Sequence, residues 1–452
     1  MAGTHRAAFV AVGAATGRGR RRPGIRFGFR LDRRGPLGVS DWLRGPRGGV
    51  ALAFGGDAVR YGELADAVAA AVLPGGDGLV ACRVGTDPIR LITLVLACLE
   101  RGRPVLVGGD AAAAERISAD LPPGTELALL TSGSSDPAGT PRAVARTNAS
   151  WLASAAPLAE IAGTGPDDRI AVTGPLHVSM HLYAALHALW TGAAVGDELR
   201  GASTLHATPT RLARLLEADT LPAAAIVAGA AMSDSLRERA AARGIRVTEY
   251  YGAAELSFVA VGRGGSLAPF PGVEVELRPA VAGRELWARS PYLALGVVGG
   301  GMLRRDDGGF ATVGDLAEPN GPETFRITGR GDAAITTAGA TVLAEDVEAR
   351  ILALPGVVAA VVLGETDALL GERVVAVVEL DGTADAAAVV AAARERLPVA
   401  ELPRRWFVNA IPTTVSGKPA RGLLQVALAA GTLGPSIPSH APHPSPSERS
   451  GA

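Results

Sequence analysis

Lys418 is the residue whose type stands out most in this sequence. It is the only lysine among the 44 lysine and arginine residues of the chain. A lysine ammonium is a compact charge on a flexible stem, and the planar guanidinium of arginine does not reproduce it. This usage therefore indicates a position at which chemistry requires an ammonium group, the alternative being an accident of composition.

A loop rich in glycine and hydroxyl side chains follows the apolar segment 127–130. The loop has the sequence TSGSSDPAGTPRAV over residues 131–144. Backbone N–H groups and hydroxyls in such a loop can surround an anion, most often a phosphate. The pattern differs from G-x-x-x-x-G-K-[ST], which excludes an ordinary P-loop protein, and a surface turn is the alternative. The candidate phosphate-binding residues are Thr131, Ser132, Gly133, Ser134, Ser135, Thr140 and Arg142.

Strands and helices alternate along most of the chain, which predicts an α/β fold with parallel strands. Helices are expected at 61–72 and 88–101, and strands at 79–84, 105–107, 170–173, 224–228 and 247–250. A smaller βαββα unit is expected to follow, with strands at 325–328, 357–363 and 373–380 and helices at 344–352 and 385–396. The sequence thus predicts a large N-terminal domain and a small C-terminal α+β domain.

Composition suggests where these domains begin and end. We expect a basic disordered leader at 1–47, the large domain at 48–328, the small domain at 329–426 and a Pro/Ser-rich disordered tail at 427–452. A secretory signal is disfavoured because the arginine run near residue 20 follows the first apolar run instead of preceding it. The cytoplasm is therefore the expected compartment.

The overall composition excludes several classes of protein. Hydrophobic residues make up 48% of the chain and charged residues 20%, which rules out a wholly disordered protein. The net charge of −1 argues against a nucleic-acid partner. No run of 18 apolar residues occurs, so no membrane span is expected. The two cysteines are too few for a disulfide framework or a four-thiolate zinc site.

Five segments taken together resemble one enzyme superfamily. Besides TSGSS, the chain contains EYYGAAE at 249–255, TVGDL at 312–316, GRGDAAITTAGATVLAEDVE at 329–348 and IPTTVSGKPAR at 411–421. Their order and spacing are similar to those of the adenylate-forming (AMP-binding) superfamily. That superfamily includes acyl-CoA synthetases, aryl-CoA ligases, adenylation domains of peptide synthetases and firefly luciferase. The resemblance covers about residues 49–425.

The resemblance implies that ATP and a carboxylic acid bind between a large N-terminal domain and a small mobile C-terminal lid. The carboxylate would attack the α-phosphorus, giving an acyl-adenylate and pyrophosphate, and a thiol, usually that of coenzyme A, would then displace AMP. ATP, Mg²⁺ and coenzyme A are thus the implied cofactors. Lys418 matches the catalytic lysine of the family, whose ammonium neutralises charge that accumulates between carboxylate and phosphate oxygens.

Other positions match residues with known roles in the superfamily. Asp315 would accept hydrogen bonds from the ribose hydroxyls, and Arg330 would contact ribose or phosphate. Glu255 would hold Mg²⁺ through a carboxylate oxygen, and Asp332 matches the hinge about which the lid rotates. Tyr251 would lie on the adenine face. The remaining implied nucleotide-binding positions are Tyr250, Gly252 and Ala254, together with Gly229, Ala230 and Ala231, which would line the adenine and acyl pockets.

The chain also departs from the pattern of the superfamily. Three extra residues, 136–138, lie inside the phosphate loop, and Asp136 would repel pyrophosphate if it pointed inward. Arg142 replaces the usual lysine of the loop, which keeps the charge. Ala254 replaces the threonine expected before Glu255 and removes one hydroxyl donor to the α-phosphate. The region between residues 107 and 130 is shorter than usual. These departures point to reduced or altered activity.

The acid-binding segment is expected at residues 175–189, which contain His177 and His181. The resemblance implies that one of these histidines contacts the acid, and the sequence leaves open which one. Their i, i+4 spacing on a possible helix also suits a metal, although no Asp, Glu or Cys lies between them. The Ala/Leu/Val-rich surroundings favour an apolar acyl group.

The resemblance therefore implies an ATP- and Mg²⁺-dependent acyl-CoA synthetase that acts on a small-molecule carboxylic acid. One alternative is transfer of the acyl group to a separate carrier protein or to another nucleophile. A second alternative is a non-catalytic homologue that binds nucleotide or acyl ligand. Retention of Lys418, Asp315, Arg330 and Glu255 favours an enzyme, whereas the altered phosphate loop and Ala254 favour the non-catalytic alternative.

Overall fold

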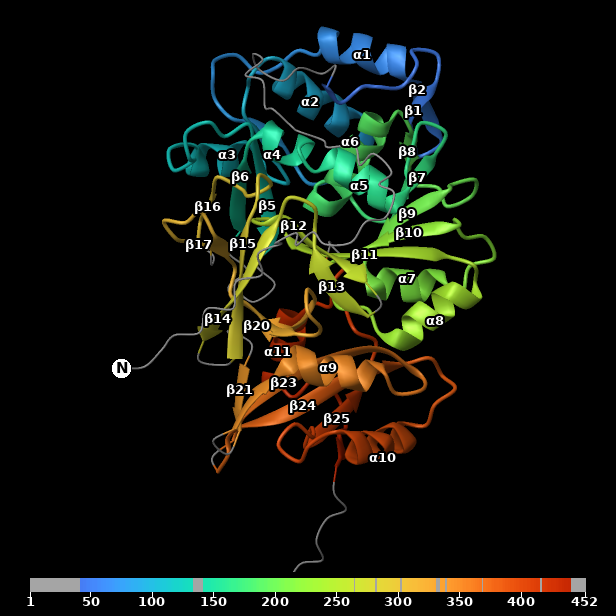
Figure 1. Ribbon diagram of the computed structural model, residues 1–452, viewed down its shortest axis with the longest axis vertical. Coiled ribbons are helices and arrows are strands. Elements are labelled where there is room, and N and C mark those ends of the chain that lie inside the picture. The colour runs from blue at the N-terminus through green and yellow to red at the C-terminus, as the bar shows by residue number, and fades with distance from the viewer. Residues whose placement is uncertain are drawn as a thin grey trace, which may run out of the picture.

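The computed structural model describes residues 41–132, 141–263, 265–280, 283–300, 303–330, 334–337, 340–367, 369–414 and 417–439. These residues form three sheets with helices packed on them (Figure 1). Two sheets belong to residues 50–330, called here the N-terminal part, and the third belongs to residues 334–439, called the C-terminal unit. In Figure 1 the C-terminal unit, coloured orange to red, lies below the rest of the molecule.

Half of the largest sheet is parallel, as the alternation of strands and helices predicts. Adjacent strands pair in the order β11-β10-β9-β7-β8-β1. Three helices pack on this half: α6 contacts β7 and β8, α7 contacts β9, and α8 contacts β11. The strands are β1 (Val50–Phe54), β7 (Arg169–Val172), β8 (Ala194–Gly196), β9 (Thr204–Ala207), β10 (Ala224–Val227) and β11 (Arg246–Ala253), and the helices are α6 (Ser179–Thr191), α7 (Pro209–Leu215) and α8 (Asp234–Ala242).

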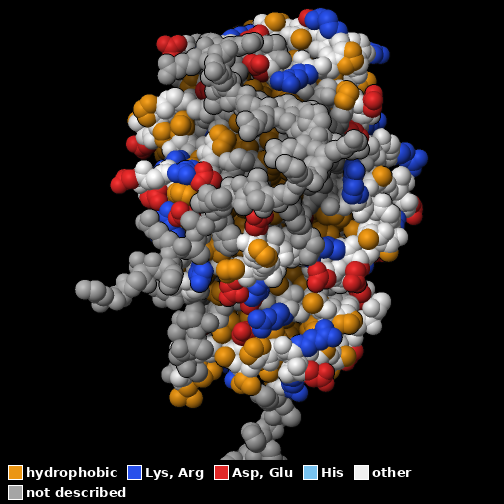
Figure 2. Space-filling view, viewed as in Figure 1, with side chains coloured by type: hydrophobic (Ala, Val, Ile, Leu, Met, Phe, Trp, Pro, Cys, Tyr) orange, Lys and Arg blue, Asp and Glu red, His pale blue; other side chains and the backbone are white. Residues whose placement is uncertain are grey.

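The other half of this sheet is antiparallel, which the sequence did not predict. It continues from β11 in the order β12-β13-β20-β19-β15-β18-β17, with β14 paired to β15. One more antiparallel strand, β2, pairs with β1 at the opposite edge of the sheet. The antiparallel strands are β2 (Asp57–Arg60), β12 (Ser257–Arg263), β13 (Ser266–Pro269), β14 (Glu274–Ala280), β15 (Gly283–Arg289), β17 (Arg304–Arg305), β18 (Ala311–Thr312), β19 (Asp315–Pro319) and β20 (Phe325–Arg330). On the face drawn in Figure 2, Lys and Arg side chains are interspersed with Asp and Glu.

The second sheet begins with three parallel strands that are connected by helices, and this part buries both cysteines. Its order is β16-β6-β5-β4-β3, with β3, β4 and β5 parallel. Cys82 and Cys98 are almost fully buried, and burial raises the pKa of their thiols to about 12 and about 11. The elements are β3 (Val80–Cys82), β4 (Val105–Val107), β5 (Leu127–Ser132), β6 (Pro141–Arg146), β16 (Gly296–Val298), α1 (Tyr61–Ala70), α2 (Pro88–Glu100), α3 (Ala111–Ser118), α4 (Asn148–Leu152) and α5 (Ala155–Ala162).

The C-terminal unit is a sheet with apolar side chains on both faces. Successive residues of β23 and β24 alternate between two hydrophobic clusters, because successive side chains of a strand point to opposite faces. One cluster includes residues of α9 and α10, and the other includes residues of α11. The elements are β21 (Ala334–Thr337), β22 (Ala340–Leu343), α9 (Ala344–Leu352), β23 (Val357–Asp367), β24 (Gly371–Leu380), α10 (Ala386–Arg396), β25 (Arg405–Val408), α11 (Arg421–Ala429) and β26 (Ile437–Pro438).

Two of the expected boundaries are wrong where the structure describes them. Trp42, placed in the expected leader, is fully buried and donates its indole N–H to Asn148 Oδ1 at 2.8 Å. The expected tail from residue 427 includes the end of α11 and the strand β26, and Trp406 donates its indole N–H to Ser439 Oγ at 2.8 Å. Both segments are ordered because they complete hydrophobic cores. Residues 1–40 and 440–452 lie outside the described residues.

None of the helices in the described residues has both the length and the apolar character that crossing a bilayer requires.

Candidate active site

Asp315 and Tyr251 meet although 64 residues separate them in the chain. Asp315 begins β19 directly after a glycine and is 6% exposed. The Tyr251 hydroxyl, at the end of β11, donates a hydrogen bond to Asp315 Oδ2 at 2.5 Å. A buried carboxylate is an acceptor for several donors at once, so this pair can hold a group that carries hydroxyls.

Several other predicted nucleotide-binding positions lie near the ends of the segments that the structure describes, or outside them. Arg330 is opposite Asp315 in the β19–β20 register, but its side chain lies outside the described residues. Thr131 is opposite Arg142 in the antiparallel pair β5–β6, so these strands enter and leave the predicted phosphate loop. The predicted positions Gly133, Ser134, Ser135, Thr140 and Asp332, and the side chain of Ser132, lie outside the described residues.

Gly229 and Lys418 are brought together from the two halves of the chain. Gly229 follows β10 with φ +97°, a conformation that favours glycine. A Cβ atom built at this position would lie 3.1 Å from Lys418 Cε and 3.4 Å from Thr208 Cγ2. The absence of a side chain at residue 229 therefore makes room for the lysine. Ala230 and Ala231 continue the turn and are exposed.

The turn that carries Ala254 and Glu255 connects β11 to β12. Gly252 approaches the opposite strand so closely that a Cβ atom there would lie 2.1 Å from Ser257 O. Ser257 has a φ of +58°, and among the described residues it is the one residue other than glycine with a positive φ. Glu255 is half-buried, and its carbonyl accepts a hydrogen bond from Ala294 N–H at 2.8 Å. A carboxylate on such a fixed turn fits a Mg²⁺ ion that is otherwise bound by phosphates and water.

Arg146 lies beneath this turn and was missed by the sequence analysis. The side chain is 0% exposed, donates from Nη2 to the Ala254 carbonyl at 2.7 Å and stacks over Trp151 at 5.1 Å. Burial lowers the pKa of its guanidinium to about 9, while the nearby Glu255 carboxylate opposes this effect. The only signal in the sequence is an arginine at the end of an apolar strand segment, which ordinarily indicates a strand end at the surface.

The histidine pair expected on one helix is divided by the start of that helix. His177 precedes α6 and is half-buried, whereas His181 lies inside α6 and is 3% exposed. The possible helix carrying both histidines is therefore not formed, since α6 begins after His177. Burial lowers the pKa of His181 to about 4, so this histidine is neutral at pH 7. His206, on β9, is equally buried and was missed. Among the residues that the structure describes, neither its Nδ1 nor that of His181 has a hydrogen-bond partner.

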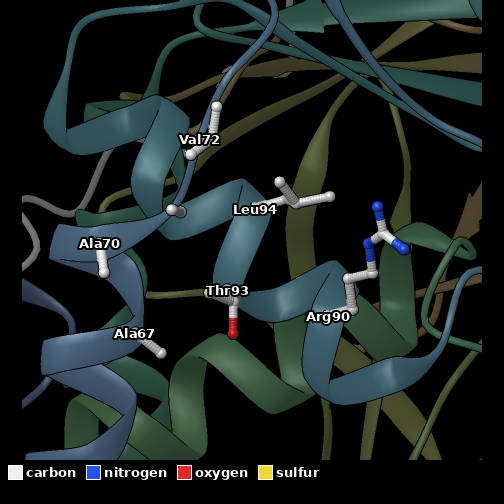
Figure 3. Close-up of a pocket in the computed structure, with 7 residues that line it drawn as sticks. Ala67, Ala70, Val72, Arg90, Thr93 and Leu94 are labelled. Atoms are coloured by element: carbon white, nitrogen blue, oxygen red, sulfur yellow. The ribbon is translucent and has the colours of Figure 1, made fainter.

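A surface depression elsewhere in the molecule contributes none of these residues. It has a volume of about 300 Å³ and lies between α1 and α2, where Arg90 and Thr93 are its polar side chains (Figure 3). In the parts of the chain that the structure describes, no group of three His, Cys, Asp or Glu side chains is placed to hold a metal ion.

Comparison with known proteins identifies the relatives of this chain. Residues 346–418 match the family described as the AMP-binding enzyme C-terminal domain. A probable 2-succinylbenzoate–CoA ligase of Mycobacterium tuberculosis is 30% identical over 298 residues, which are 61% of this chain and 73% of that protein. The chain belongs to the adenylate-forming (AMP-binding) superfamily. The resemblance carried by the five sequence segments is thereby confirmed.

Other members of the adenylate-forming superfamily show how far the likeness extends. YhfT, an uncharacterized acyl-CoA ligase of Bacillus subtilis (strain 168), is 29% identical over 331 residues, 65% of this chain and 66% of that protein. The chain spans 58–66% of the length of the first three curated relatives that it matches. The ATP-bound MatB of Rhodopseudomonas palustris has the same fold, with a TM-score of 0.72, 19% identity and coverage of 88% of this chain and all of MatB.

Proposed function

We propose that this protein converts a carboxylic acid into an acyl-adenylate with ATP and then transfers the acyl group to the thiol of coenzyme A. The observation that carries the proposal is the position of Lys418, whose Cε lies 3.1 Å from the Cβ position of Gly229. The only lysine of the chain thus extends from the C-terminal unit to the glycine turn of the N-terminal part.

The reaction explains why an ammonium is needed there. In the first step an acid oxygen forms a bond to the α-phosphorus, and the bond from that phosphorus to the bridging oxygen of pyrophosphate breaks. Negative charge builds up between the two reactants, and the Lys418 ammonium neutralises it. In the second step the thiolate attacks the acyl carbon and AMP leaves.

The neighbouring residues have roles that fit this chemistry. Asp315, held by Tyr251, accepts hydrogen bonds from the ribose hydroxyls, and Glu255 would hold the Mg²⁺ that neutralises phosphate charge. Arg146 supports the turn of Glu255 from below through the Ala254 carbonyl. His177 or His181 contacts the acid, and His181 would do so as a neutral imidazole.

Coenzyme A is favoured over a carrier protein because the curated relatives named above are CoA ligases. For the acid, an apolar acyl group remains the prediction for this chain. Two free, buried cysteines agree with the cytoplasm as the proposed compartment.

Separate measurement of the two half-reactions tests the proposal. A panel of acids is screened by ATP–pyrophosphate exchange, and thioester formation is measured from preformed acyl-adenylate. Lys418→Ala should slow exchange about a hundredfold or more and leave thioester formation near the parent rate. Lys418→Arg should restore exchange only in part, because the charge returns with a different shape.

Arg396→Ala, at the exposed end of α10, serves as the control and should match the parent in both steps. Equal exchange rates in the parent, Lys418→Ala and Lys418→Arg would refute the catalytic assignment. An absence of exchange with every acid would instead favour a nucleotide- or acyl-binding protein without catalysis.

A further inference from the structure

The hairpin that carries Lys418 is built largely from its own backbone. Thr413 and Pro419 form a β-bridge, Thr414 N–H donates to Lys418 O at 2.7 Å, and Gly417 N–H donates to Thr414 O at 2.8 Å. We call the described residues 411–414 and 417–419 the lysine hairpin. These contacts fix its shape but leave its position against the N-terminal part to other residues.

One end of the lysine hairpin is tied to α7 through a carboxylate of β24. Arg214 Nη2 donates to both oxygens of Glu379, at 3.4 and 3.2 Å, and to Ile411 O at 3.4 Å. Glu379 Oε2 also accepts the Ile411 N–H at 2.7 Å. Arg214 and Glu379 therefore hold both backbone groups of the first hairpin residue, across the boundary between the two parts of the molecule.

The other end of the lysine hairpin is tied to the residue that caps α7. Thr208 is 3% exposed, and its hydroxyl donates to Gly417 O at 3.0 Å while accepting the Arg211 N–H at 3.2 Å. Gly417 has φ +77°, and a Cβ atom there would lie 3.2 Å from Thr208 Oγ1. The next residue is Lys418, which lies against Gly229. One contact thus comes from the short helix α7 and the other from the residue that caps it, and α7 contacts β23 of the C-terminal unit (Figure 1).

These contacts lie outside the hydrophobic cores of the units that they connect. α7 is held in the N-terminal part by Leu212 and Ala213, and β24 is held in the C-terminal unit by its alternating valines. The Arg214 and Glu379 side chains are 37% and 21% exposed, so water and salt weaken their attraction. The two contacts can therefore form and break without unfolding either unit.

We propose that Arg214 and Thr208 are positioning residues, which hold Lys418 at the glycine turn by fixing both ends of the lysine hairpin. The consequence for rates rests on the proposed function, whereas the consequence for the position of Lys418 does not. Both can be measured separately.

The first measurement uses Lys418 as the only lysine of the chain. The protein receives a pulse of acetic anhydride, and acetylation of the peptide that contains Lys418 is followed by mass spectrometry. Arg214→Met should raise the labelling rate about two- to fivefold, the range expected for loss of a partly exposed ion pair. Arg214→Lys should stay close to the parent. Arg169→Met is the matched control, because Arg169 pairs with Glu198 inside the N-terminal part at a similar exposure of 36%.

Two further arms of the labelling experiment address each contact alone. Raising the salt concentration should increase labelling of the parent but not of Arg214→Met, whose ion pair is already lost. Thr208→Val should increase labelling about as much as Arg214→Met, because the hydrogen bond to Gly417 O is lost together with the one from Arg211 N–H. Thr208→Ser keeps the hydroxyl and should not increase it. Equal labelling rates in the parent, Arg214→Met and Thr208→Val would overturn the proposal.

The second measurement separates positioning from a general structural role. Arg214→Met should lower pyrophosphate exchange about two- to fivefold and spare thioester formation from preformed acyl-adenylate. In a Lys418→Ala background the same change should have no further effect, since Arg214 acts through that lysine. A loss in both half-reactions, or an additive loss without Lys418, would contradict the proposal. If the parent shows no exchange, the proposed function fails, and labelling alone still decides whether Arg214 and Thr208 position the lysine.

Discussion

Replacement of Asp315 by alanine tests where the nucleotide binds. Asp315 is 6% exposed, and the Tyr251 hydroxyl already occupies one direction on Oδ2 at 2.5 Å. A carboxylate has about four acceptor directions, and in the proposed complex with ATP two of them would accept the ribose hydroxyls. The change removes both of these hydrogen bonds from the complex with ATP.

The expected effect follows from the strength of such bonds. A hydrogen bond to a charged group contributes about 1.5–3 kcal/mol, and Tyr251 competes for one of the two oxygens. We therefore expect Asp315→Ala to weaken ATP binding by about 2–4 kcal/mol in total, which is about 30- to 1000-fold in Kd. Binding of the acid should change little, because the residues proposed to contact the acid, His177 or His181, are different ones.

Titration calorimetry with ATP and with 2′-deoxy-ATP measures this effect. The parent should bind the deoxy compound more weakly than ATP, whereas Asp315→Ala should not distinguish the two. Glu318→Ala is the matched control, since Glu318 lies on the same strand but is exposed and paired with Arg326. A thermal melt shows whether loss of the buried carboxylate has unfolded the protein. A folded Asp315→Ala protein that binds ATP normally would place the nucleotide elsewhere.

Two other changes test the glycine turn and the buried histidines. Gly229→Ala places a Cβ atom 3.1 Å from Lys418 Cε at a φ of +97°. Pyrophosphate exchange should therefore slow at least about tenfold, while ATP binding should stay unchanged. Gly201→Ala is the control, because its φ of +75° strains the backbone equally but no atom lies within 4 Å of the new Cβ, and it should not slow exchange. Burial lowers the pKa of His181 and His187 to about 4, so between about pH 4 and 6.5 the unfolded chain binds more protons than the folded chain. The free energy of unfolding should therefore fall as the pH drops below 6.5, by up to about 1.4 kcal/mol per pH unit for each histidine, and a free energy from urea denaturation that is equal at pH 7.5 and 5.5 would contradict this.

The C-terminal unit was predicted from the sequence more completely than the large sheet. The helix expected at 344–352 has those bounds, and β23 and β24 contain the expected strands. The apolar residues of α9, β23 and β24 belong to hydrophobic clusters made by elements close in the chain, so the local periodicity of the sequence predicts these elements well. The antiparallel half of the large sheet was not predicted. Several of its strands are short, and the pairs β13–β20 and β15–β19 join strands that are not consecutive in the chain, which alternation of side chains cannot identify.

In the candidate site, too, residues within sequence motifs were predicted, whereas a residue that depends on tertiary contacts was not. Motifs predicted Asp315, Tyr251, Gly229 and Lys418, and the structure brings them together as two pairs, although their roles in catalysis remain predictions. Arg146 could not be predicted, because only the tertiary structure supplies Trp151 and the Ala254 carbonyl to a buried guanidinium.

The positions of the two cysteines have a practical consequence for enzymology. A thiol reacts with aromatic disulfide reagents as the thiolate, and burial raises the pKa of Cys82 and Cys98 to about 12 and about 11. The native protein should therefore give almost no colour with such a reagent. The loss of the free thiol of coenzyme A during the reaction can then be measured without a correction for protein thiols. The same reagent becomes a counter of unfolded molecules when denaturant is added, since both thiols then become exposed together with the core that encloses them.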